Sequence, residues 1–295
     1  MQSSPLLVLL LSAGVSGFAV PATRAPHALH ARPVPALARV PSQSAPTMAL
    51  ALAPQTVTAL ALNSGLAGVG ILKGQKVLTP MGLAHAWALG VMLWGSLGWR
   101  GWSTCVLYLI GGSIVTKVKK AKKEALGIAE GRGGTRGPEN VWGSAATAAV
   151  CALASARWPA KASLLLIGFA TSLATKLSDT CASEIGKAYG TKTYLITTLR
   201  ECKPGEEGGV SLEGTAAGFV GSLVLTAYAC AIGLISRAAV VPCLLAAFIA
   251  TNIESLIGAV AQDKFALLTN EVVNFIMTVI GAAVVMALAL VLKLA

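Results

Sequence analysis

The segment from residue 170 to residue 221 holds the richest set of side chains that could do chemistry. Read as a helix through about residue 190, it aligns polar side chains on one face, because they lie three, four and seven residues apart. These residues are Lys176, Asp179, Thr180, Ser183 and Lys187, with Glu184 flanking them. A carboxylate, hydroxyls and two ammonium groups in one stripe suit a magnesium-bound polyphosphate. The simpler alternative is an ion pair between Lys176 and Asp179 that binds no ligand.

A glycine-rich turn follows this predicted helix. Residues 203–211 read KPGEEGGVS, and a further helix is predicted to start near Leu212. Backbone N–H groups of such a turn, together with the N-terminus of the next helix, form a potential anion site. No Walker motif is present, and a plain turn remains the alternative. Gly186 and Gly190 keep the face of the preceding helix low enough to admit a ligand or another helix.

A second basic region could bind a phosphate group. Five lysines fall between Lys117 and Lys123, and Arg132, Arg136 and the pair Glu139–Asn140 follow them. Such a region could hold the head of a phosphate monoester. The alternative for the lysines is strong, because juxtamembrane lysines often only fix topology or bind anionic lipid.

Membrane helices must position these residues. Of the 295 residues, 55% are hydrophobic and 12% are charged, whereas soluble domains carry about 25% charged residues. This composition excludes an ordinary soluble domain, a disordered chain and a coiled coil. Apolar runs predict an all-α fold, a polytopic membrane helix bundle of about eight transmembrane helices within a single domain, 48–295. The predicted spans are 49–71, 80–98, 101–116, 140–156, 162–177, 214–236, 239–259 and 272–292.

Charge separates the two sides of this predicted bundle. When eight spans alternate, 15 Lys and Arg residues fall in connections on one side and five on the other, and all 12 carboxylates lie on or face the first side. The positive-inside rule orients the charged side toward the cytosol-like compartment, which in a plastid is the stroma. The formal charge of +11 therefore mostly reflects protein targeting and the orientation of the bundle in the membrane. No nucleic acid partner is expected.

The first 47 residues have the composition of a targeting segment. Residues 1–20 contain a short apolar run that ends in small residues, as in a signal peptide, and residues 21–47 are rich in Ala, Pro, Arg and Ser without acids, as in a plastid transit peptide. We therefore expect a multi-pass protein of a plastid membrane, the inner envelope in particular. The alternative is an N-terminal tail without a targeting role.

Two families share motifs with this chain. The spacing Asp179-x-x-Ala182-x-x-x-Gly186-x-x-x-Gly190 resembles an element of the CTP-dependent polyprenol kinases, such as dolichol kinase and phytol kinase. Residues 211–215, SLEGT, resemble their K-x-x-E-G-[ST] element, with the lysine displaced to Lys203. Longer segments resemble the integral membrane family of transmembrane protein 19 over about residues 50–290. These segments are 116–119, 136–144, 176–186, 197–198, 204–205, 208–215 and 252–255.

The second resemblance, in its plant chloroplast branch, implies a reaction. It implies that phytyl phosphate is phosphorylated to phytyl diphosphate for tocopherol synthesis by a nucleoside triphosphate, with CTP favoured and Mg²⁺ as cofactor. A phosphate monoester has a second pKa of about 6, so it is already an anionic nucleophile and no strong general base is required.

Candidate residues can be assigned to that reaction. The predicted catalytic residues are Asp179, Lys176 and Glu184, and the predicted metal ligands are Asp179, Glu184, Glu213 and Glu254. The predicted nucleotide- or phosphate-binding residues are Ser183, Gly186, Lys187, Gly190, Lys203, Gly208, Gly209, Ser211, Glu213, Lys117, Arg136, Asn140 and Asn252. Two other functions remain open at this point, a transporter of an anionic metabolite or lipid and a membrane-bound cytidylyltransferase.

Overall fold

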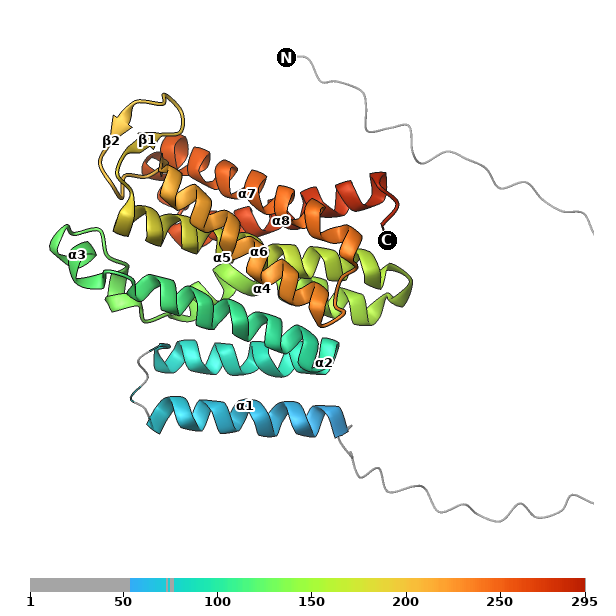
Figure 1. The fold of residues 1–295 in the computed structure, drawn as a ribbon. Coiled ribbons are helices and arrows are strands. Elements are labelled where there is room, and N and C mark those ends of the chain that lie inside the picture. The colour runs from blue at the N-terminus through green and yellow to red at the C-terminus, as the bar shows by residue number, and fades with distance from the viewer. Residues whose placement is uncertain (1–53, 73, 75–76, 295) are drawn as a thin grey trace, which may run out of the picture. The chain divides into compact units, whose positions relative to one another are not determined.

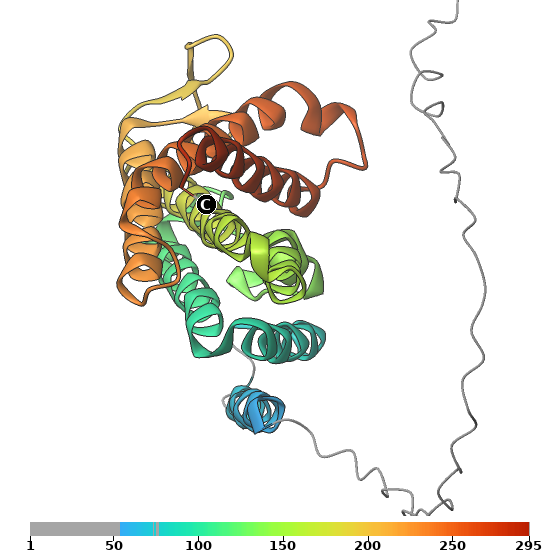
Figure 2. The same ribbon diagram turned by 90° about the vertical axis from the view of Figure 1, so that its right-hand side faces the viewer.

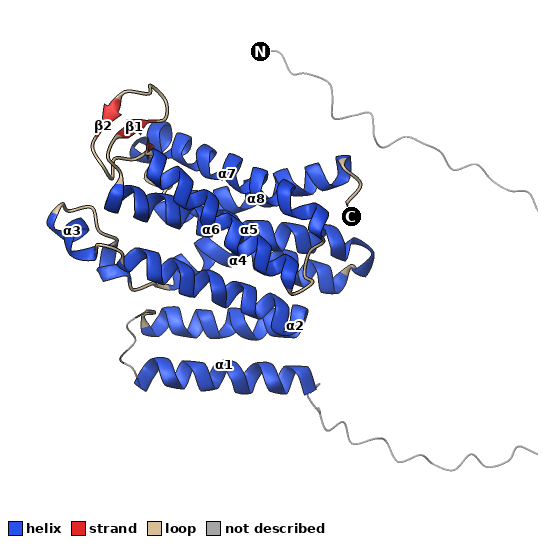
Figure 3. Cartoon of the chain, viewed as in Figure 1, coloured by secondary structure: helices blue, strands red, loops and turns tan. Residues whose placement is uncertain are grey.

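The computed structural model describes residues 54–72, 74 and 77–294, which form a bundle of helices (Figures 1 and 3). The predicted signal and transit segments, 1–20 and 21–47, lie outside the described residues. The helices are α1 (Pro54–Leu72), α2 (Pro80–Lys117), α3 (Lys120–Ala125), α4 (Pro138–Arg157), α5 (Ala162–Tyr189), α6 (Leu212–Ala231), α7 (Val240–Ala261) and α8 (Asn270–Val291). Short 3₁₀ turns are η1 (Gly131–Gly134), η2 (Pro159–Lys161), η3 (Arg237–Ala239) and η4 (Gln262–Lys264).

The prediction of an all-α polytopic membrane fold is confirmed. Within the described residues, five helical segments are long and apolar enough to cross a membrane, namely α1, α5 with η2, α6, α7 with η3, and α8. The remaining predicted spans correspond to α4 and to the two parts of α2, which are not among these five. In α4 the polar start at Glu139 and Asn140 and many small residues lower the hydropathy, and this helix is buried among its neighbours.

Helix α2 reverses direction at Gly98. This residue has φ 64° and ψ −157°, a backbone conformation that is essentially restricted to glycine. The two predicted spans on either side of it therefore become two helical parts that double back on each other (Figure 1). Across the reversal the Trp94 and Trp102 rings pack edge to face, with centroids 5.6 Å apart.

Helix α5 lies at the centre of the bundle and contacts α2, α4, α6, α7 and α8. Figure 2 shows this helix surrounded by its neighbours. Its middle is apolar and fully buried, as at Phe169, Ala170 and Leu173. The predicted span 162–177 and the predicted polar stripe belong to this one helix, which ends at Tyr189 with Gly190 as its C-cap. The stripe therefore continues the most buried element of the fold.

Small residues allow α6 to lie very close to α5. A Cβ atom added at Gly214 would lie 2.6 Å from the Ala182 carbonyl oxygen, and one at Gly218 would lie 3.0 Å from the Ser178 carbonyl oxygen. The face of α6 that meets α5 thus has no room for a side chain at Gly214 or Gly218, as is typical of packed membrane helices.

We predict that Gly221→Ala lowers the free energy of unfolding by about 1–3 kcal/mol, because the new Cβ overfills a packed contact. It would lie 2.8 Å from Cys181 Sγ and 3.1 Å from the Leu177 carbonyl oxygen. The matched control is Gly68→Ala on α1, where nothing lies within 4 Å of the new Cβ. Thermal unfolding in mild detergent should show a loss for Gly221→Ala alone, and equal melting temperatures would contradict the prediction.

The charged connections gather at one end of the bundle. Helix α3 and a small antiparallel sheet lie at the left in Figure 1, whereas the turn between the two parts of α2 and the end of α8 lie at the right. The sheet consists of β1 (Thr193–Leu195), β2 (Glu201–Cys202) and β3 (Gly209–Val210) in the order β2-β1-β3. We call the end with α3 and the sheet the charged end.

Candidate functional site

A polar cavity of about 210 Å³ lies at the charged end of the bundle. We call it the polar cavity. It is lined by the second half of α5, the start of α6, the end of α7, the start of α8 and the glycine-rich turn. The carboxylates that line it are Glu130, Asp179, Glu184, Glu206, Glu207 and Glu254, and the cations are Arg136, Lys176 and Lys187. Six carboxylates against three cations give a surface that favours a divalent cation over a free anion.

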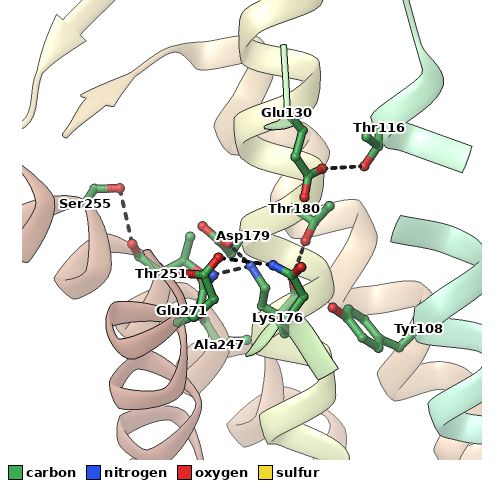
Figure 4. A network of polar contacts seen from close by, with 12 residues as sticks. Tyr108, Thr116, Glu130, Lys176, Asp179, Thr180, Ala247, Thr251, Ser255 and Glu271 are labelled. Atoms are coloured by element: carbon green, nitrogen blue, oxygen red, sulfur yellow. Dashed lines mark hydrogen bonds and ion pairs between the residues drawn. The ribbon is translucent and has the colours of Figure 1, made fainter. Parts of the chain in front are cut away.

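Lys176 and Asp179 form a buried ion pair in this cavity (Figure 4). Lys176 Nζ donates to Asp179 Oδ2 at 2.6 Å and to Asn274 Oδ1, on α8, at 2.9 Å. The Lys176–Asp179 ion pair, which the sequence predicts as the alternative to a ligand site, is therefore present. Both residues also line the polar cavity. Asp179 Oδ1 makes no hydrogen bond with the described residues, so it is free to hold a ligand.

Glu184 is neutralised by a lysine from the basic run. Lys123 has 1% of its surface exposed, forms an ion pair with Glu184 and donates to the Thr116 carbonyl oxygen at 2.8 Å. Lys122 Nζ donates to the Ala188 carbonyl oxygen at 2.9 Å, near the end of α5. Part of the lysine run thus fastens α3 to α5.

Arg136 lies at the edge of the polar cavity and is 7% exposed. Its Nη1 donates to the Tyr108 hydroxyl at 2.9 Å. Tyr108, and to a smaller extent Glu130 and Glu184, raise the pKa of Arg136 above its ordinary value against the effect of burial. The guanidinium therefore remains charged at every physiological pH.

The first turn of α4 forms a polar junction with α8 through Asn140. Asn140 accepts from the Gly137 N–H at 2.9 Å and donates to Glu271 Oε1 at 3.1 Å. Arg132 pairs with Glu139 and donates to Asn140 Oδ1 at 2.8 Å. Asn140 is thus fixed in place where α4 meets the polar cavity.

The glycine-rich turn is pinned to α7. Gly208 has φ 76°, and a Cβ there would lie 2.7 Å from the Ser255 carbonyl oxygen. This contact brings the turn beside Glu254, whose carboxyl lies within reach of the charges of Asp179 and Glu207. The Ser211 hydroxyl accepts from the Gly214 N–H at 3.1 Å and caps α6, so this oxygen already takes part in a structural hydrogen bond.

Most residues predicted from the sequence line the polar cavity. They are Lys176, Asp179, Ser183, Glu184, Gly186, Lys187, Gly208, Gly209, Ser211, Arg136, Asn140, Asn252 and Glu254. Gly190, Lys203, Glu213 and Lys117 do not line it.

The predicted residues outside the cavity have other surroundings. Glu213 accepts from the Thr191 N–H at 3.1 Å and hydroxyl at 2.7 Å, so it fastens the turn after α5. A Cβ at Gly190 would lie 3.1 Å from Ser211 Oγ, so the glycine allows Ser211 to pack closely against the end of α5. Lys117 lines a different, apolar cavity.

Several lining residues have no counterpart among the predicted ones. Among them are Tyr108, Glu130, Glu206, Glu207, Asn270 and Asn274. Asn270 and Asn274 stand four residues apart at the start of the last span. Such a polar pair at the start of a membrane span could have indicated a functional site. Nothing in the local sequence indicates that Tyr108, in the middle of an apolar run, faces a polar site.

A magnesium ion would fit this cavity only with help from a ligand. Among the described residues, no three His, Cys, Asp or Glu side chains lie close enough to hold a metal ion by themselves. Mg²⁺ is commonly bound by one or two carboxylates, with water and substrate phosphates completing its shell. Asp179, with its free oxygen, and Glu254 meet that requirement.

Comparison with known proteins identifies the family. The model of the integral membrane protein family DUF92 matches residues 63–282. The chain belongs to the DUF92 family. An uncharacterized membrane protein of Synechocystis is 54% identical over 77% of this chain and 89% of its own length. Protein VTE6, chloroplastic, of Arabidopsis thaliana is 44% identical over 70% of this chain and 64% of its own length.

A third similar protein comes from an archaeon. An uncharacterized membrane protein of Methanocaldococcus jannaschii is 29% identical over 72% of this chain and 87% of its own length. No solved structure matches the chain. The DUF92 match contains every residue that lines the polar cavity, from Tyr108 to Asn274. The cavity therefore lies wholly within the part of the chain that defines the family.

Proposed function

We propose that this protein is a lipid-phosphate kinase. It transfers a phosphoryl group from a nucleoside triphosphate to phytyl phosphate, or a related prenyl phosphate, for tocopherol or prenylquinone synthesis. The observation that carries the proposal is the polar cavity at the end of a membrane bundle, where Asp179 and Lys176 lie beside Arg136 and further carboxylates. The 44% identity to the chloroplastic VTE6 protein supports a plastid role.

The residues of the cavity suit a reaction that needs positioning more than proton transfer. A monophosphate acceptor is already anionic near neutral pH, so the task is to hold two anions in line and offset their charge. Lys176, Lys187 and Arg136 supply the cationic contacts. Asp179 and Glu254 would hold Mg²⁺, which supplies charge neutralisation on the phosphate oxygens when bound.

The same proposal includes a location. We place the protein in a plastid membrane, the inner envelope in particular, with the charged end toward the stroma. Three observations support this placement: the composition of residues 1–47, the excess of Lys and Arg at the charged end, and the similarity to the chloroplastic VTE6 protein.

Product analysis tests the reaction directly. The purified protein in liposomes is given phytyl phosphate, Mg²⁺ and one of CTP, UTP, GTP or ATP. The expected products are phytyl diphosphate and the nucleoside diphosphate, with CTP the best donor and with no product in excess EDTA. A CDP-lipid with released pyrophosphate would identify a cytidylyltransferase, and uptake of phytyl phosphate without nucleotide consumption would identify a transporter. Either result contradicts the proposal.

A further inference from the structure

A second cavity, of about 500 Å³, lies between α1, both parts of α2 and the start of α4. We call it the apolar cavity. Its walls are mainly leucine, valine, alanine, isoleucine and tryptophan side chains, such as Leu83, Leu93 and Val106. Its size falls within the range of about 300–1,000 Å³ that is typical of small-molecule sites. None of the reaction steps proposed above uses it.

The apolar cavity meets the polar cavity at four residues that line both of them. These residues are Tyr108, Arg136, Asn140 and Ser144. Water-soluble groups can therefore occupy one side of this junction while hydrocarbon occupies the other. The junction has the layout that an amphiphilic ligand requires.

Arg136 is the charged residue of this junction and is firmly held. The backbone N–H of Arg136 donates to the Val77 carbonyl oxygen, and the backbone carbonyl oxygen of Arg136 accepts from the Thr79 N–H, both at 3.0 Å. A guanidinium has five N–H donors, and among the described residues only the hydrogen bond to Tyr108 uses one of them. The remaining donors are available to a ligand, and a phosphate is the group that such a planar fork binds best.

The far end of the apolar cavity is closed by a satisfied polar pair. Trp102 Nε1 donates to Asn63 Oδ1 at 3.1 Å, and Asn63 Nδ2 donates to the Ala59 carbonyl oxygen at 2.8 Å. Because these groups are already paired, they offer little to a polar ligand such as a nucleotide base. Trp102 lies six residues from Tyr108 on α2, so this end is about 9 Å along the helix from the junction.

From this geometry we propose that the apolar cavity holds the hydrocarbon chain of a prenyl monophosphate whose phosphate binds Arg136. The identity of the chain as prenyl rests on the proposed function. Charge complementarity fixes the head of this ligand, and the apolar walls fix its tail. Arg136 donates to the Tyr108 hydroxyl, and both residues line the polar cavity together with Lys176 and Asp179. A phosphate on Arg136 would therefore face the Lys176–Asp179 pair that Figure 4 shows.

The test measures binding of two acceptors to the purified full chain in nanodiscs, without nucleotide. One is phytyl monophosphate and the other is dimethylallyl monophosphate, which has the same head and a very short tail. Ala67→Trp, which fills the apolar cavity from α1, is expected to weaken phytyl monophosphate binding at least about tenfold, as when about two methylene groups lose their contacts. Binding of dimethylallyl monophosphate should stay unchanged.

The matched control is Ala61→Trp, the same substitution at an exposed position of α1 outside the apolar cavity. It should bind both acceptors like the wild type. Equal phytyl monophosphate affinity in Ala67→Trp and the wild type would overturn the proposal, and so would phytol competing as well as phytyl monophosphate, because the phosphate would then not be selected.

A second measurement needs no variant. A phytyl monophosphate analogue with a photoreactive tail should label residues that line the apolar cavity on α1 and α2, and labelling confined to outward faces would overturn the proposal. Both measurements omit nucleotide, so they can succeed even if no phosphoryl transfer is found. Conversely, kinase activity with unchanged binding in Ala67→Trp would reject the tail site and keep the proposed function.

Discussion

Asp179→Asn is expected to lower the rate of phosphoryl transfer by about 10²–10³-fold, similar to the loss of one well-placed electrostatic group in other active sites. The amide keeps the size of the side chain and can still accept a hydrogen bond from Lys176 Nζ, now at 2.6 Å from Asp179 Oδ2. It removes the negative charge that a phosphate-bound Mg²⁺ would need. The measurement is the initial rate of phytyl diphosphate formation at saturating nucleotide and Mg²⁺.

The control for Asp179→Asn is Glu201→Gln, the same loss of charge at an exposed residue of β2 outside the polar cavity. Its rate should stay within about twofold of the wild type, since surface substitutions away from a site have small effects. The melting temperature of Asp179→Asn is measured in parallel, because a buried lysine loses its charged partner. A folded Asp179→Asn protein with near wild-type turnover would exclude Asp179 as a metal ligand.

The local pattern of the sequence predicts the parts of the fold that depend on neighbouring residues. The polar residues from Lys176 to Lys187 lie three or four residues apart, which places them on one face of a helix. The structure confirms that they belong to one helix, α5. The apolar runs predict the spans because a membrane helix must be apolar over a length set by the bilayer. The alternation of charged and uncharged connections follows from the same span count.

The contacts that complete the site depend on tertiary packing and have no local signal. Asn274 reaches Lys176 across 98 residues, and Lys123 reaches Glu184 across 61 residues. The predicted spans 80–98 and 101–116 imply a reversal between them, but the span pattern does not show that Gly98 makes it with a positive φ. For Glu213 the local pattern is misleading. This carboxylate stands at a predicted helix start, but it accepts a hydrogen bond from Thr191 and does not line the polar cavity.

The buried pair between Lys123 and Glu184 supports a prediction about stability. Lys123→Met is expected to lower the free energy of unfolding by about 3–5 kcal/mol, because Glu184 is left as an uncompensated charge in the interior. The matched control is Lys120→Met on the same short helix, whose ion pair with Glu124 spans 3.7 Å with side chains 41% and 54% exposed. Exposed pairs contribute about 0–1 kcal/mol, so this variant should unfold almost like the wild type.

A double variant separates a structural role of Glu184 from a catalytic one. In Lys123→Met with Glu184→Leu no charge is left buried, and replacing a buried pair by apolar side chains is often neutral for stability. Its unfolding free energy should return to within about 1 kcal/mol of the wild type, and a double variant as unstable as Lys123→Met would contradict the assignment of the loss to an unpaired Glu184. Once folding is restored, activity decides the role of the carboxylate. If Glu184 contacts the nucleotide or its metal, as the sequence predicts, the stable double variant makes little phytyl diphosphate. If it only anchors α3 to α5, the double variant keeps most of its activity, and catalysis then depends on Asp179 and Glu254.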